Sequence, residues 1–142
     1  NFFMEKNWDI KRCYSFPGWC DIELLDFIWD EIPKGNKTFS YWLTLNSHFP
    51  YSERDISQKS IKDITLCSEL NIGDLDAPVC RNFILNRQLF RAIAEKSERT
   101  PIHNLTIVLV GDHMPIFIEE KDKNLFSKEI FGRRRFLYVA TK

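Results

Sequence analysis

The sequence predicts an α/β fold in which a mostly parallel β-sheet is flanked by helices. Segments with the apolar spacing of helices alternate with strand-like segments along the chain. Residues 105–110 form a continuous β-branched and aliphatic run, which is typical of buried parallel strands. The chain has 142 residues, 44% of them hydrophobic, so it can bury a substantial core. The order of elements favours right-handed crossovers between parallel strands.

The first predicted helix covers residues 21–32. Its apolar residues recur at three- and four-residue steps, Asp21 can cap the free amide groups at its start, and proline and glycine after residue 32 end it. Residues 38–45 alternate aromatic and aliphatic side chains with other residues, a pattern that predicts a strand covered on both faces. A polar loop containing His48 and closed by Pro50 follows this strand.

The second half of the chain contains a helix and two strands. Residues 52–78 are polar with alternating charges, and we expect a surface insertion there. Residues 79–96 carry apolar side chains on more than one face, which predicts a largely buried helix. The strand at 105–110 and a last strand at 136–141 are separated by a polar segment, whose arginines at 133–135 we interpret as part of a solvated loop.

Charge and hydropathy exclude several classes of protein. Lysine plus arginine (20) balances aspartate plus glutamate (20), so the net charge does not indicate nucleic acid as a partner. No run approaches the roughly 18 to 20 apolar residues that cross a bilayer, and residues 1–6 do not resemble a signal peptide. Because the chain begins at Asn1 and stops one residue after a strand-like run, we expect a piece of a longer protein.

The four cysteines leave two interpretations open. Cys13 with Cys20, and Cys67 with Cys80, would each close a loop through a turn-rich segment, which would imply an oxidising compartment. Alternatively, all four are reduced thiols, some of them buried. Their spacings suit neither a CxxC redox pair nor a zinc ribbon.

Two histidine-bearing loops are the candidate site. Asp112 and His113 follow Gly111 at the end of the 105–110 strand, and His48 follows the 38–45 strand in the same way. Parallel strands would bring both loops to one edge of the sheet, where ligands bind in α/β folds. A carboxylate beside an imidazole suits zinc or manganese. Both loops could instead be ordinary turns, and His103, which precedes a strand, is expected at the surface.

Residues 41–51 (YWLTLNSHFPY) and 107–115 (IVLVGDHMP) resemble the later half of a sulfatase-like catalytic domain of the alkaline phosphatase superfamily. The similarity is closest to the lipoteichoic acid synthases and phosphoethanolamine transferases, which are membrane-anchored enzymes. It covers about residues 20–115, so residues 1–142 would be the C-terminal portion of such a domain.

The resemblance implies a role for three residues. Asp112 and His113 match paired ligands of a divalent metal, zinc or manganese, and His48 matches a catalytic histidine beside the phosphate or head group of the substrate. The threonine or serine nucleophile and an acidic metal ligand would lie outside this chain, so we expect the chain alone to have little activity.

The function that the resemblance implies is phosphoryl-group transfer to or from lipid or glycan head groups, such as phosphoethanolamine or glycerol phosphate transfer. It also implies a place on the periplasmic or extracellular face of a bacterial inner membrane, with the anchor outside this chain. Two alternatives stay open: a sulfatase or phosphodiesterase of the same superfamily, and a non-catalytic α/β binding domain.

Overall fold

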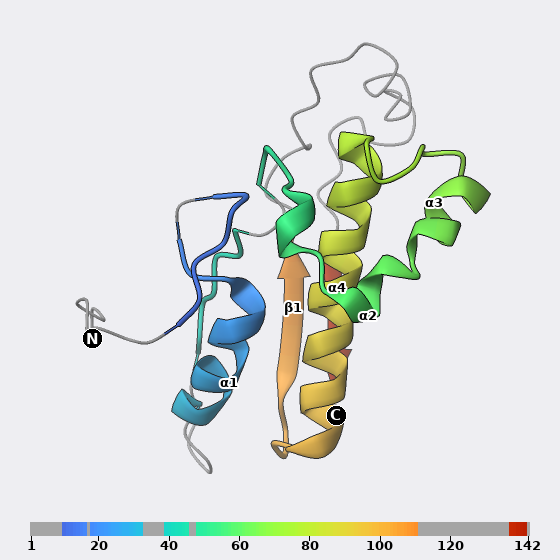
Figure 1. Ribbon diagram of the computed structural model, residues 1–142. Coiled ribbons are helices and arrows are strands. Elements are labelled where there is room, and N and C mark those ends of the chain that lie inside the picture. Colours follow the sequence, from blue (N-terminus) through green and yellow to red (C-terminus); the bar gives the residue numbers. More distant parts are fainter. Residues whose placement is uncertain (1–9, 17, 33–38, 46–47, 111–136, 142) are drawn as a thin grey trace.

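A computed structural model describes residues 10–16, 18–32, 39–45, 48–110 and 137–141 (Figure 1). The elements, in chain order, are α1 (Asp21–Glu31), the 3₁₀ helix η1 (Glu53–Asp55), α2 (Gln58–Ile61), α3 (Ile64–Glu69), α4 (Pro78–Arg99), β1 (Thr106–Val110) and β2 (Leu137–Thr141). The long helix α4 lies between β1 and the short helices α2 and α3 (Figure 1). Helices therefore dominate the described part of the chain.

The predicted fold class, a mostly parallel α/β sheet, is wrong. The sheet in the described residues has two strands, and β1 pairs with β2 in antiparallel register, from Thr106 opposite Thr141 to Val110 opposite Leu137. Exposed and half-buried residues alternate along β1, and Val108 and Val110 are 52% and 58% exposed. The expectation of a buried strand at 105–110 is therefore wrong. The strand itself and the last strand are confirmed, but not their parallel arrangement.

The predicted strand at 38–45 is also wrong, since residues 39–45 form no strand and Thr38 lies outside the described residues. Phe39 is 90% exposed and Tyr41 is 78% exposed, so the expected burial on both faces is absent as well. An alternating pattern makes a strand only where a neighbour supplies hydrogen bonds, and this segment pairs with no strand in the part of the chain that the structure describes.

Both predicted long helices are confirmed, with different details at their ends. Helix α1 begins at Asp21, and Cys20 at its N-cap makes no side-chain capping hydrogen bond; Oδ2 of Asp21 accepts a hydrogen bond from the backbone amide of Leu45 at 2.8 Å. Helix α4 has Pro78 in its first turn, where a missing amide hydrogen costs nothing. The indole of Trp29 donates to the carbonyl oxygen of Thr100 at 2.9 Å and so joins α1 to the end of α4.

The main core lies between α4 and the segment that precedes it. Its fully or nearly buried members are Tyr51, Ile56, Cys67, Val79, Cys80, Ile84 and Leu85. Residues 52–78, expected as a polar surface insertion, fold into η1, α2 and α3 and contribute Ile56 and Cys67 to this core. A disulfide between Cys67 and Cys80, with both residues 0% exposed, joins α3 to the first turn of α4.

Candidate functional site

Both predicted disulfides are present, so the interpretation with four reduced thiols is wrong. Cys13 and Cys20 close residues 13–20 into what we call the 13–20 loop. Backbone hydrogen bonds tighten this loop, because Cys13 N donates to the carbonyl of Gly18 at 2.9 Å and Cys20 N donates to that of Lys11 at 3.0 Å. The described parts of this loop are therefore held both covalently and by the backbone.

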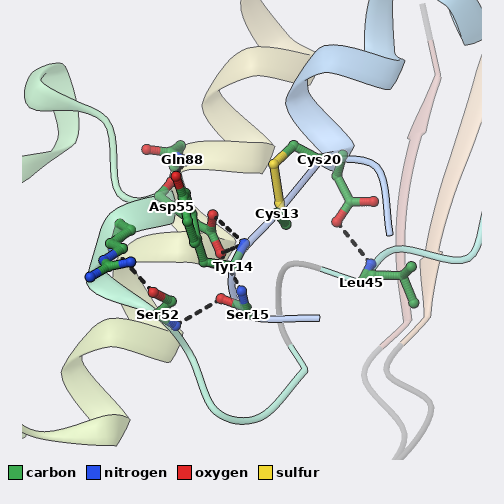
Figure 2. The surroundings of a disulfide bond; sticks show 10 residues. Cys13, Tyr14, Ser15, Cys20, Leu45, Ser52, Asp55 and Gln88 are labelled. Carbon is green, nitrogen blue, oxygen red and sulfur yellow. Dashed lines mark hydrogen bonds between the residues drawn. A yellow bond between two sulfur atoms is a disulfide. The ribbon is translucent and has the colours of Figure 1, made fainter. Parts of the chain in front are cut away.

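Asp55 fixes the 13–20 loop to η1 (Figure 2). The backbone amide of Tyr14 donates to Oδ1 and Oδ2 of Asp55 at 2.9 and 3.1 Å, and the amide of Ser15 donates to Oδ2 at 2.6 Å. Asp55 is 8% exposed, and its own backbone carbonyl accepts a hydrogen bond from Gln88 of α4 at 2.9 Å. Since a buried carboxylate requires such donors, this residue ties three segments of the chain together.

The candidate histidine, His48, lies on a turn formed by residues 48–52, which we call the His48 turn. Its Nδ1 is 2.9 Å from the carbonyl oxygen of Phe49. A carbonyl oxygen can only accept, so Nδ1 carries the hydrogen in this contact, and Nε2 makes no hydrogen bond to the residues that the structure describes. The imidazole is exposed to solvent, and its ring centroid lies 4.6 Å from that of Phe16 in the 13–20 loop.

The His48 turn is held from both ends. Ser52 N donates to the hydroxyl of Ser15 at 2.7 Å, which links the turn to the 13–20 loop (Figure 2). Arg81 of α4 donates from Nε to the carbonyl oxygen of Tyr51 at 2.7 Å, and the Tyr51 side chain is 1% exposed in the core. The backbone beside His48 is therefore anchored to α4 and to a disulfide-bonded loop, while the imidazole itself stays open to solvent.

Cys13, Cys20 and Asp55 place sulfur and carboxylate atoms within 4.8 Å of one another, the spacing of a metal site. The two sulfur atoms are bonded to each other, however, and thiolates are the form that binds metal. The carboxylate oxygens are also engaged by the Tyr14 and Ser15 amides. This cluster does not fit zinc or manganese in the oxidised protein.

The other predicted site residues have different outcomes. Asp112 and His113, the proposed metal ligands, lie outside the described residues, and so do the arginines at 133–135. His103 is exposed, as expected. The structure therefore describes one of the three residues assigned to the site. Parallel strands do not bring His48 to the 111–113 segment, because residues 39–45 form no strand and β1 pairs antiparallel with β2, so their meeting rests on the resemblance and stays a prediction.

Sequence reasoning missed Asp55 and Ser15, which position the His48 turn. Their contacts join residues about forty positions apart, 40 for Ser15 N to Asp55 and 37 for Ser52 N to Ser15. Ser52 caps η1 by accepting from Arg54 N at 3.3 Å, and this local pattern is what the sequence could have indicated. It says nothing of the distant loop that Asp55 binds.

Comparisons with family models, with curated proteins and with solved structures found no match to this chain. None of the helices that the structure describes is long and apolar enough to cross a membrane.

Proposed function

We propose that this chain contributes to metal-dependent transfer of a phosphoryl group on lipid or glycan head groups, with His48 beside the phosphate. The transferred group would be phosphoethanolamine or glycerol phosphate, and the threonine or serine that forms the covalent intermediate would lie outside this chain. The observation that carries the proposal is the hydrogen bond from His48 Nδ1 to the Phe49 carbonyl, since the ring is exposed and its Nε2 has no partner in the described ranges.

This geometry suits two roles of a histidine in phosphoryl transfer. When the ring is neutral, Nε2 has a lone pair for a metal ion; when the ring is protonated, Nε2 donates a hydrogen bond to a phosphate oxygen. A backbone carbonyl bound to the other ring nitrogen is the usual way in which proteins orient such an imidazole. The contacts of Phe16 and Ser15 with the turn add to that orientation.

Asp112 and His113 are the residues that we propose as ligands of zinc or manganese. One imidazole and one carboxylate are both suitable for these ions. A bound ion would neutralise charge on the phosphoryl group during transfer. His48 Nε2 fits such a site, whereas the Cys13, Cys20 and Asp55 cluster does not.

Paramagnetic Mn²⁺ provides a test that does not depend on activity. We expect substoichiometric Mn²⁺ to broaden the imidazole NMR signals of His48, because the proposed site brings it near Asp112 and His113. His103 is the internal control, since it is exposed and lies in the connection between α4 and β1, which Figure 1 shows at the end of β1 opposite η1. The Asp112→Asn variant should lose the broadening of His48, with its far-UV circular dichroism unchanged.

Two results would contradict the proposal. One is equal broadening of His48 and His103, which would indicate weak binding to any exposed imidazole. The other is unchanged broadening of His48 in Asp112→Asn. Little turnover of a nitrophenyl phosphate by this chain is expected in either case, because the nucleophile would lie outside it.

The two disulfides are consistent with an oxidising compartment, and a periplasmic or extracellular location is part of the proposal. The proposed membrane anchor, outside this chain, comes from the resemblance alone. Hydrolysis by a sulfatase or phosphodiesterase of the same superfamily would use the same residues and differ in the acceptor. Product analysis with water and with an alcohol acceptor, on a protein that includes the nucleophile, would separate transfer from hydrolysis.

A non-catalytic interaction domain is the second candidate, and one observation favours it. Phe39, Tyr41 and Leu43 are 90%, 78% and 59% exposed, and they occupy alternate positions of a segment without helix or strand. Large exposed apolar side chains are common where a protein meets a partner. If Mn²⁺ leaves the histidine signals unchanged while Tyr41→Ser alters self-association in sedimentation, the interaction domain is the better explanation.

A further inference from the structure

A groove runs along one face of α4, outside the His48 turn and the 13–20 loop. Its lining residues are Phe83, Asn86, Arg87, Phe90 and Arg91, and its volume is about 340 Å³. These residues follow one another at three- and four-residue steps, so they form a single stripe on the helix. We call this feature the α4 groove. Its volume lies at the lower end of the range of small-molecule sites, roughly 300–1,000 Å³.

The groove carries a net positive charge. Arg91 donates from Nη2 to both carboxylate oxygens of Asp63, at 3.1 and 2.9 Å, and Nε of Arg87 lies 3.4 Å from the same carboxylate. Asp63 is 5% exposed, so its carboxylate is shielded from solvent and pairs with these two arginines. Within the described ranges, two guanidinium groups against one carboxylate leave one positive charge in excess.

The next carboxylate along α4 does not neutralise this excess. Glu95 accepts a hydrogen bond from Lys59 at 2.6 Å, and Arg99 lies 3.7 Å from its other oxygen. Lys59 is also the principal reason that the pKa of Glu95 is lowered from its ordinary value. Arg91 also contributes to this lowering, so Glu95 interacts with a groove arginine as well. Positive charge still remains in excess among the described residues, because four cations, Lys59, Arg87, Arg91 and Arg99, face two carboxylates, Asp63 and Glu95.

Hydrogen-bond donors of both arginines lack acceptors in the described part of the chain. Arg91 Nη1 is buried and has no hydrogen-bond partner there. The Arg87 side chain is 45% exposed, and its contact with Asp63 uses Nε, which leaves its terminal nitrogens for another acceptor. The terminal nitrogens of Arg87 are the accessible donors, so an anionic oxygen in the groove would accept from them and lie beside the positive charge of Arg91.

Apolar surface lies directly beside these donors. Phe83 and Phe90 lie within one turn of Arg87 on opposite sides of it along the helix, and Phe90 is 48% exposed. An exposed ring next to a guanidinium group can contact an aryl or alkyl group while the cation binds the charge of the same molecule.

We propose that the α4 groove binds a small amphiphilic anion. Its carboxylate or phosphate pairs with Arg87 and Arg91, and its aryl or alkyl body packs on Phe83 and Phe90. The volume of the groove and its net charge both match this class of ligand. The inference does not depend on the proposed phosphoryl transfer, because none of the lining residues belongs to the His48 turn.

Phenyl phosphate is the probe that tests the proposal, in an NMR titration of the isotope-labelled chain with its disulfides intact. We expect saturable shifts of the Arg87 and Arg91 Nε–H signals and of the α4 amides around Phe90. Inorganic phosphate should bind about tenfold more weakly, because it lacks the apolar body, and benzyl alcohol should not saturate at millimolar concentration, because it lacks the charge.

Arg87→Gln should weaken the binding of phenyl phosphate about tenfold, which corresponds to the loss of one charged hydrogen bond. Phe90→Ala should weaken its binding several-fold. Arg99→Gln is the matched control, since its side chain is 77% exposed on the same helix and does not line the groove. All three side chains are substantially exposed, so these variants should fold, which circular dichroism can verify.

The proposal is overturned if inorganic phosphate binds as tightly as phenyl phosphate, since the rings would then contribute nothing. It is equally overturned if Arg87→Gln and Arg99→Gln have the same effect, or if the shifts lie away from α4. Because the titration observes α4 directly, its failure is separate from any failure of the Mn²⁺ experiment at His48.

Discussion

Replacing Asp55 with alanine would remove the carboxylate that fixes the 13–20 loop to η1. The backbone amides of Tyr14 and Ser15 would then lose their acceptor in a site where Asp55 is only 8% exposed. A hydrogen bond to a charged group contributes about 1.5–3 kcal/mol. Taking the lower figure for each of the two amides, we expect the free energy of unfolding to fall by about 3 kcal/mol.

Urea unfolding at neutral pH, with the disulfides oxidised, measures this loss, and amide hydrogen exchange at Tyr14 and Ser15 should become faster. Glu53→Ala is the matched control, because Glu53 is exposed in the same 3₁₀ helix, and it should change stability by less than about 0.5 kcal/mol. Asp55→Asn keeps one acceptor oxygen, so its free energy of unfolding should lie between those of Asp55→Ala and Glu53→Ala. Equal stability of Asp55→Ala and Glu53→Ala, with unchanged exchange, would refute the reasoning.

Three further predictions follow from other contacts. Replacing both Cys67 and Cys80 with alanine should lower the free energy of unfolding, measured in urea, by about 3 kcal/mol. The reason is that the unfolded chain regains the conformational entropy of a loop with a sequence separation of 13. Trp29→Phe removes a hydrogen bond to a carbonyl at the end of α4 and should cost about 1–2 kcal/mol in thermal unfolding; no loss would contradict that bond. The pKa of Glu95 should be below its ordinary 4.5 by carboxyl NMR titration and return toward 4.5 in Lys59→Gln, since Lys59 is the largest cause of the lowering. Because the folded pKa is the lower one, the contribution of Glu95 to stability is present above pH 4.5 and declines as the pH falls through the folded value.

The features that sequence reasoning predicted correctly depend on residues close together in the chain. The spacing of apolar residues located α1 and α4 to within a few residues, because helical hydrogen bonds join positions four apart. The disulfides were among the predicted pairings for the same reason, since each joins cysteines that are near neighbours in sequence.

The features that were predicted wrongly depend on distant partners. The alternation at 38–45 describes a segment able to join a sheet, but no described neighbour pairs with it, and Phe39 and Tyr41 remain exposed. The run at 105–110 gave the existence of β1 correctly, yet nothing in an apolar run states whether its neighbour is parallel or antiparallel. In the candidate site, the sequence predicted that His48 lies in a loop, and it lies on a turn. No pattern in the sequence near Asp55 indicates that its carboxylate helps to hold that turn, because it binds a loop 40 residues away.

The sequence-local disulfides also have a consequence for how the chain becomes oxidised. Four cysteines allow three pairings, and this protein has the one that closes loops with separations of 7 and 13. Each of the other pairings would require two loops of roughly fifty residues or more, and the probability that chain ends meet falls as about the three-halves power of loop length. Polymer statistics in the unfolded chain therefore already favour the native bridges. Correct pairing then follows from proximity along the chain and does not require the fold to select it.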